Sequence, residues 1–275
     1  MPQYDEDVSV EESEVIEEEE DFEDEELSIA EKVIGVYIAP VNTFRQLADR
    51  PDFWTAFIIL SLIGIALATV MLPRTLPIVT SGTVEQMQES FTAQGMSETD
   101  QATALSVMTK TVRISSYVGA IIGPPIQYAI GWLLVTALIF FIALIQGFDT
   151  DFKRLLGVVP WLTFISIGSS ITAVVRLMNT ELVSMQQMQK LQMQMPLSIG
   201  ALIPEGANLP VFIEGVLGLI DPFFIWSTIV MVFALQYANR CSRSKAITTT
   251  IIATVIILAV MGGLMTLGRM FNPGS

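Results

Sequence analysis

Few residues in this chain are of the types that carry out chemistry at neutral pH. The sequence has no histidine, and Cys241 is its one cysteine. A Ser-His or Cys-His catalytic pair therefore cannot form within the chain, nor can a disulfide, and a zinc site would lack its usual nitrogen and sulfur ligands. These absences argue against most hydrolases and metalloenzymes, so we expect neither an enzyme nor a bound cofactor or metal.

Charged residues in or next to apolar segments are the next candidates for functional residues. A charge inside a membrane is costly, so where one occurs it often marks the path of an ion or substrate. Asp221 precedes Pro222 at the start of an apolar stretch, a pattern typical of a helix N-cap followed by proline at the first helical position. Arg176 lies at the end of another such stretch, where a long side chain can reach the interface. We predict structural roles for both, with a transport role for Asp221 as the alternative.

Methionine thioethers and the polar side chains within the apolar segments are the remaining candidate functional groups. Met185, Met188, Met193 and Met195 lie among glutamines, and thioether sulfur binds Cu(I). With no histidine or cysteine nearby, we favour an adaptable apolar face over a metal site. Polar side chains within the apolar segments could line a solute path or form hydrogen bonds between helices, and we favour the hydrogen bonds. These side chains are Gln127, Thr136, Thr163, Ser166, Ser169 and Ser170.

The chain divides into two very different parts, an acidic N-terminal segment and an apolar body that holds the residues named above. Of 275 residues, 52% are hydrophobic, and the formal net charge is −14. Residues 1–26 hold 15 of the 28 acids and no base, so the rest carries 13 acids against 14 bases. We predict that residues 1–27 form a disordered acidic tail. It either docks a basic partner or cations, or remains a solvated arm, which we favour; it repels nucleic acid.

The body reads as an all-α polytopic membrane helix bundle, because a span needs about 20 apolar residues. Residues 73–116 are predicted to form a small helical hairpin outside the membrane, 176–210 a second polar excursion, 211–220 an interfacial or re-entrant piece, and 268–275 a short C-terminal tail. We predict five spans, at 53–72, 126–146, 155–175, 221–239 and 246–267.

Residues 28–52 precede the first span as two short amphipathic helices. Ser28 and Glu31 fit a capping box, and Pro40 separates the two helices. Such pieces next to a span favour interfacial helices on the bilayer surface; the alternative is that they pack on the end of the bundle.

Lysine and arginine near the spans predict the orientation. Residues 27–52, 147–154 and 240–245 hold eight bases in 40 residues, whereas 73–116, 176–210 and 268–275 hold six in 87. We therefore expect a cytosolic N-terminus and an external C-terminus.

Three short motifs lie at particular positions relative to the predicted spans. Pro40, Thr43, Phe44, Leu47 and Arg50-Pro51 precede the first span, Gly147 to Arg154 (including Phe152 and Lys153) precede the third, and Asp221, Phe224 and Trp226 open the fourth. Over residues 30–267 the chain resembles the Yip (Ypt/Rab-interacting protein) domain family. In eukaryotes this family is implied in vesicle trafficking and contact with prenylated Rab-type GTPases. The eukaryotic loop motifs are not evident here, so the resemblance implies the bacterial branch and the bacterial cytoplasmic membrane.

We expect a non-enzymatic scaffold or adaptor in membrane organisation or a trafficking-like process. Its partners would be the lipid bilayer and other membrane proteins, or a cytosolic protein reached through the acidic tail, and it could form a homo-oligomer. The alternative is a component of a small-solute transporter or channel, for which the polar side chains within the spans would line the path.

Overall fold

The computed structural model describes residues 26–181, 184–185, 187–188, 191, 194–204, 207 and 209–271, with side chains to Gly268. The predicted disordered tail lies outside this range except for its last two residues. The described part is all helical: α1 Ile29–Ile38, α2 Pro40–Asp49, α3 Phe53–Ala93, α4 Glu98–Ile145, α5 Phe152–Asn179, the 3₁₀ turn η1 Ile199–Leu202, α7 Val211–Leu219, α8 Pro222–Ala238 and α9 Arg243–Phe271.

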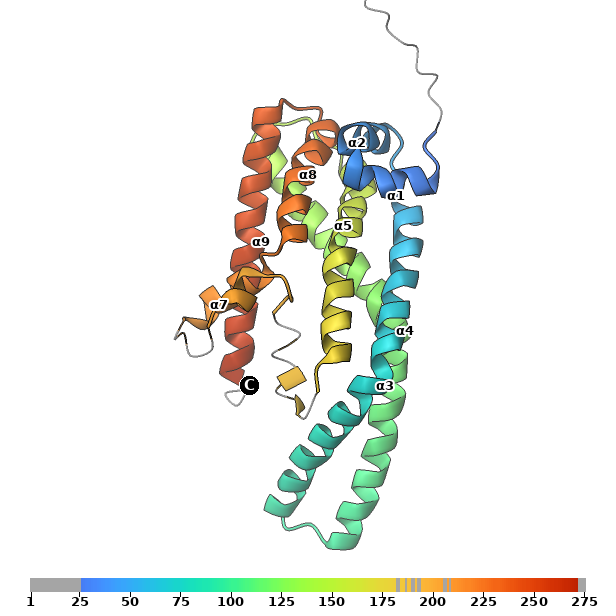
Figure 1. Cartoon of the computed structure of the whole chain (residues 1–275), viewed down its shortest axis with the longest axis vertical. Helices are drawn as coiled ribbons and strands as arrows, with labels where there is room; N and C mark the ends of the chain where they lie inside the picture. Colours follow the sequence, from blue (N-terminus) through green and yellow to red (C-terminus); the bar gives the residue numbers. More distant parts are fainter. Residues whose placement is uncertain are drawn as a thin grey trace, which may run out of the picture.

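The long helices run roughly side by side along the long axis of the molecule, and α1 and α2 lie across one end (Figure 1). Four helices, α3, α4, α5 and α9, are long and apolar enough to cross a membrane. The pair α7 and α8 qualifies as a fifth span if counted together, with a bend of 71° between its helices. The chain is an integral membrane protein of four spans, or of five, the predicted number, when the bent pair is counted as one span.

The α3–α4 pair is longer than expected. α3 has 41 residues and α4 has 48, so at about 1.5 Å per residue each is roughly twice the thickness of the hydrocarbon core. Separate helices in the 73–116 hairpin were predicted; instead, both continue unbroken from the spans, and Figure 1 shows them projecting beyond the other helices. Prolines lie inside both helices, which membrane helices tolerate when neighbours re-satisfy the freed carbonyls.

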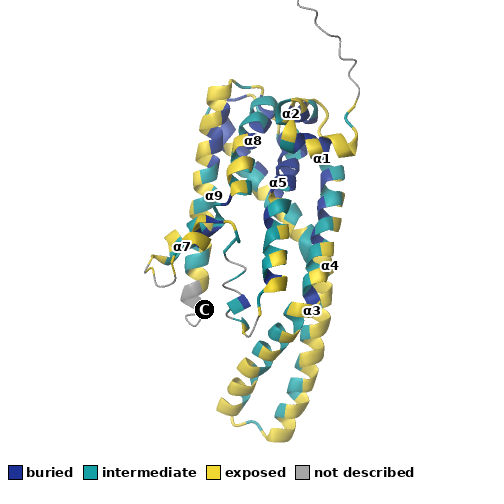
Figure 2. Cartoon of the chain, in the orientation of Figure 1, coloured by how far each residue is buried: buried dark blue, intermediate teal, exposed yellow. Residues whose placement is uncertain are grey.

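The core lies towards the end covered by α1 and α2, where buried residues gather (Figure 2). Fully buried side chains from α2, α3, α5 and α8 meet there, among them Phe44, Leu60, Trp161 and Leu235. Many apolar side chains elsewhere on the long helices are exposed, as expected of surfaces that face lipid.

The two short helices begin as the sequence predicts. Ser28 and Glu31 form a complete capping box, and Pro40 is the first residue of α2. α2 buries Phe44 and its neighbours against α5 and α8, so it packs on the bundle end, the alternative considered for this segment. α1 leaves Ile38 exposed at the same end.

Candidate functional site

The capped end of the bundle joins the three segments whose basic residues predicted the topology. Thr150 donates a hydrogen bond to Asn239 at 2.6 Å, and the Arg154 guanidinium donates to the Ala238 carbonyl at 3.3 Å. The Lys245 ammonium lies 5.0 Å from the centre of the Phe148 ring. Arg45 of α2 lies over the Tyr237 ring of α8, so the α1–α2 segment and the loops after α4 and α8 form one surface, which we call the basic end.

A buried lysine joins α1 to α3 at this end. The Lys32 ammonium is 3.1 Å from an Asp52 carboxylate oxygen and 3.6 Å from Glu26, and the lysine side chain is 7% exposed. Asp52 also caps α3 by accepting from the Thr55 amide. Burial raises the pKa of Asp52, but hydrogen bonds from Thr55 and Lys32 outweigh this effect, so the pKa lies below its ordinary value.

The linker between α2 and α3 is locked onto α5. Trp161 is fully buried and donates its indole N–H to the Asp52 carbonyl at 2.9 Å. Pro51 lies so close to Gly157 that an added Cβ on the glycine would be 2.7 Å from the proline Cα. Tyr37 of α1 donates to the carbonyl of Phe164 on α5. The predicted motif residues Phe44, buried in α2, and Pro51, in contact with α5, therefore help to hold α1 and α2 on the end of the bundle.

The conformation of the turn between α4 and α5 is explained by residues within the turn itself. Gly147 adopts φ +72°, the left-handed conformation that ends a helix and favours glycine. Asp151 caps α5 by accepting from the backbone amides of Lys153 and Arg154. Phe152 packs edge-on against Phe140, with ring centres 5.6 Å apart. Gly147 and Phe152 are thus structural, and the Lys153 side chain is exposed.

A pocket of about 270 Å³, lined in part by charged side chains, opens at the basic end between α2 and the turn after α8. The Arg45 guanidinium lies 5.4 Å from the centre of the Tyr237 ring. Arg240 adopts φ 47° directly after α8, the one non-glycine with positive φ in the described residues. Sequence reasoning counted both arginines toward the topology but did not find this pocket. Its lining residues are Arg45, Asp49, Gln236, Tyr237, Arg240 and Cys241.

Asp221 lies deeper in the bundle, and the structure does not bring it to the basic end. It caps α8 as predicted: one carboxylate oxygen accepts from the Phe224 amide at 2.6 Å, and the other accepts from the Ser169 hydroxyl of α5. The residue is 3% exposed. Trp226, one turn further along α8, is 37% exposed and does not join this pair.

A small groove of about 150 Å³ lies among α4, α5, α8 and α9. Two of its lining residues are bonded to each other: the Trp132 indole of α4 donates to the Thr163 hydroxyl of α5 at 2.8 Å, an interhelical bond of the predicted kind. Ser166 and Thr228 also line the groove, and the Thr228 hydroxyl donates to a carbonyl of its own helix. Of the remaining predicted polar residues, Thr136 is fully buried and Gln127 is exposed.

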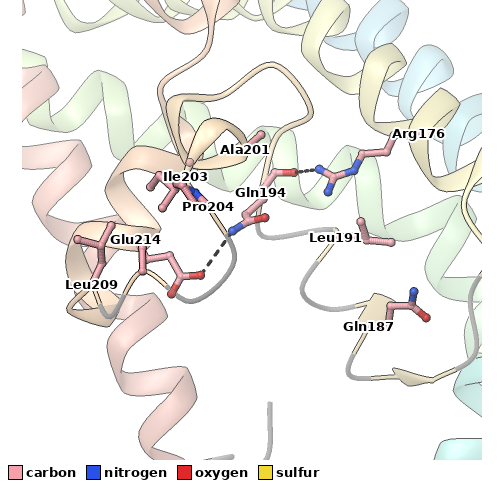
Figure 3. Close-up of a pocket in the computed structure, with 11 residues that line it drawn as sticks. Arg176, Gln187, Leu191, Gln194, Ala201, Ile203, Pro204, Leu209 and Glu214 are labelled. Atoms are coloured by element: carbon pink, nitrogen blue, oxygen red, sulfur yellow. Dashed lines mark hydrogen bonds between the residues drawn. The ribbon is translucent and has the colours of Figure 1, made fainter.

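A third pocket, of about 340 Å³, lies at the far end of α5 (Figure 3). Arg176 donates to the Gln194 carbonyl at 3.0 Å, and the Gln194 side chain donates to Glu214 at 3.4 Å (Figure 3). Arg176 therefore ties α5 to the segment before α7, beyond the helix-end role predicted for it.

The methionine-rich segment is only partly described. Met188 is buried, and Met185 approaches Gly82 of α3. Met193 lies outside the described residues. Among the described residues, no three His, Cys, Asp or Glu side chains gather as metal ligands.

Comparisons with known proteins place this fold. The model of the Yip1 domain family matches residues 34–265, which include all of α2 to α8 and most of α9. Neither a search of curated proteins nor one of solved structures found a match. Because the matched region covers most of the chain, the protein belongs to the Yip1 domain family.

Proposed function

We propose that this Yip1-family protein is a non-enzymatic membrane scaffold or adaptor that recruits partners through its acidic tail. The supporting observation is where the tail leaves the body. Glu26, its last acid, lies 3.6 Å from Lys32 and 3.8 Å from Arg50 of the basic end. Beyond it are 14 further acids with no base. The tail thus leaves the body beside the basic residues of α1 and α2, which suits an arm that presents charge to a partner.

The proposal includes a location: the bacterial cytoplasmic membrane, with the basic end and the N-terminus cytosolic. The three segments rich in lysine and arginine contact one another at one end of the bundle, which supports a cytosolic location for that end, because positive residues prefer the cytosolic side. A polyanionic arm next to an anionic leaflet is repelled from the lipid. It is therefore held available to basic proteins.

Crosslinking in native membranes tests this function with two variants of the full chain. In the first, the acids of residues 5–25 are replaced by Asn and Gln. The matched control replaces the exposed hairpin acids Glu85, Glu89 and Glu98 by Gln. We expect the tail variant to lose salt-sensitive crosslinks to basic partners and the hairpin variant to keep them. Identical crosslinks from both variants and the parent chain would refute the recruitment function.

The groove beside Trp132 supports a second candidate, a component of a small-solute transporter, because hydroxyl side chains, among them Thr163, Ser166 and Thr228, line an otherwise mostly apolar groove. Trp132 and Thr163 both line the groove and are bonded to each other, so a solute that used the Thr163 hydroxyl as an acceptor would have to replace that bond. Reconstituted protein separates the two functions: solute flux abolished by Thr163→Val would support transport, and absence of flux across a solute panel would support the scaffold.

A further inference from the structure

We propose that the pocket at the basic end binds a phosphate group carried on the headgroup of an anionic membrane lipid. This inference goes beyond the scaffold function, because it assigns a ligand to the body of the protein and needs no protein partner. It rests on two arginines, on the backbone that holds one of them, and on the place of the pocket in the bundle.

Arg45 is held rigidly at one wall. Its neighbours Phe44 and Leu47 are fully buried, so α2 cannot turn without exposing them. The guanidinium then stacks on Tyr237, a contact that orients its planar fork. Among the described residues, no ion pair joins Arg45 to Asp49, the acid of the pocket. The guanidinium therefore keeps its charge for a ligand.

Arg240 also lines the pocket, and its backbone adopts a conformation that is unfavourable for a residue other than glycine. The turn after α8 ends with the Cys241 amide bonded to the Gln236 carbonyl and the Arg240 amide bonded to the Tyr237 carbonyl. This helix ending normally uses glycine at the left-handed position. An arginine there strains the backbone, and such strain concentrates at functional sites. The exposed Arg240 side chain likewise forms no ion pair within the described part of the chain.

The chemistry of the lining fits a phosphate. Arginine donates two parallel hydrogen bonds to phosphate oxygens, which makes it the preferred residue for this group. The Gln236 side chain also lines the pocket and can donate to a further oxygen. Arg154, bonded to the carbonyl of Ala238 at the same turn, adds positive charge beside the pocket.

The position of the pocket favours a lipid over a free phosphate. Ile38 of α1 is 77% exposed and Ile145 at the end of α4 is 86% exposed. α1 lies at the end of the bundle that carries α2 (Figure 1), and the loop after α4 is hydrogen-bonded to the turn after α8. Large apolar side chains left exposed here indicate contact with acyl chains at the level of the headgroups. A headgroup entering from the bilayer would reach the two arginines.

The test titrates the purified full chain in detergent with three probes: short-chain phosphatidylglycerol, short-chain phosphatidylcholine and inorganic phosphate. We expect phosphatidylglycerol, which carries a net negative charge, to bind about tenfold more tightly than either other probe. Equal binding of phosphatidylcholine or of inorganic phosphate would overturn the assignment to an anionic lipid.

The variants separate the pocket from general charge. Arg240→Gly removes the guanidinium and restores the residue that the backbone favours, so thermal stability should hold or rise while lipid affinity falls about tenfold. Arg45→Gln should lose affinity similarly. Lys153→Gln removes one exposed charge from the same end but outside the pocket, and should change affinity less than about twofold. An equal loss in Lys153→Gln, or unchanged affinity in Arg240→Gly, refutes the site. Protease sensitivity of the tail raised by Arg240→Gly, with lipid affinity intact, would make the acidic tail the occupant.

Discussion

The Lys32 ammonium lies 3.1 Å from the Asp52 carboxylate although the lysine side chain is almost completely buried. Breaking such a pair leaves a buried charge, whereas replacing both members by apolar groups can be nearly neutral. Asp52→Ala should therefore destabilise the protein by about 2–3 kcal/mol, through the lost ion pair and the lost cap of α3. The double variant with Lys32→Met should recover much of that loss. Thermal unfolding in detergent measures both, and additive losses would show that the pair is not coupled.

The same carboxylate gives a pH dependence. The pKa of Asp52 lies below its ordinary value of 3.8 in the folded protein. Because its pKa is lowered in the folded protein, ionised Asp52 stabilises the fold at pH values above the ordinary pKa. This stabilisation is lost as the pH falls through the pKa of the folded state. The melting-temperature gap between the parent and Asp52→Asn should stay constant from pH 7 to about 5 and close below 3.8. A gap that widens in acid would contradict the stated direction.

The contact between Pro51 and Gly157 predicts a steric effect. An alanine at 157 would place its Cβ 2.7 Å from the proline Cα, so the linker or α5 must shift. Gly157→Ala should cost about 1–3 kcal/mol. Gly131→Ala is the matched control: it also lies in a long helix, and an added Cβ there meets nothing within 4 Å. Equal melting temperatures for the two variants would rule out a tight joint at Pro51.

How much of this arrangement is readable from sequence depends on whether the cause is local. Ser28 with Glu31, and Asp221 with Pro222, were predictable because a cap involves residues within one turn. The Lys32–Asp52 pair was not, since both residues also suit an exposed surface and only the packing of α1 on α2 and α5 buries the lysine beside Asp52.

Two other features had no usable local signal. The prolines of α3 and α4 normally mark helix ends, but here both helices pass through them, supported by each other along their length. The pocket at the basic end depends on the left-handed backbone of Arg240, where sequence favours glycine. Counting charges predicted a basic surface, yet the paired arrangement of Arg45 and Arg240 arises from the packing of α2 on α8.

Reporter fusions test the proposed topology. Because the loops containing Gly147 and Asn239 carry the basic residues, fusions at these positions should give cytosolic signals, and a fusion at Ser275 an external one. An external signal at Gly147 together with a cytosolic signal at Ser275 would invert the topology.

Asp221 provides the sharpest separation of scaffold from transporter. Its carboxylate accepts from the Phe224 amide and from Ser169, so its contacts in the structure are those of a cap. Asp221→Asn keeps an oxygen for the amide and a polar group for the hydroxyl, and should cost under about 1 kcal/mol. Asp221→Leu loses the cap and leaves Ser169 unpaired in a buried site, and should cost about 2–3 kcal/mol.

Thermal stability and solute flux should be measured on both variants in the same reconstituted preparation. A capping residue gives graded stability losses, with Leu worse than Asn, and partner crosslinks that survive in Asn. A transport carboxylate gives the opposite pattern, because removing the charge alone stops translocation. If Asn and Leu abolished flux equally while both melted at the parent temperature, Asp221 would be a transport residue and the scaffold function would have to be abandoned.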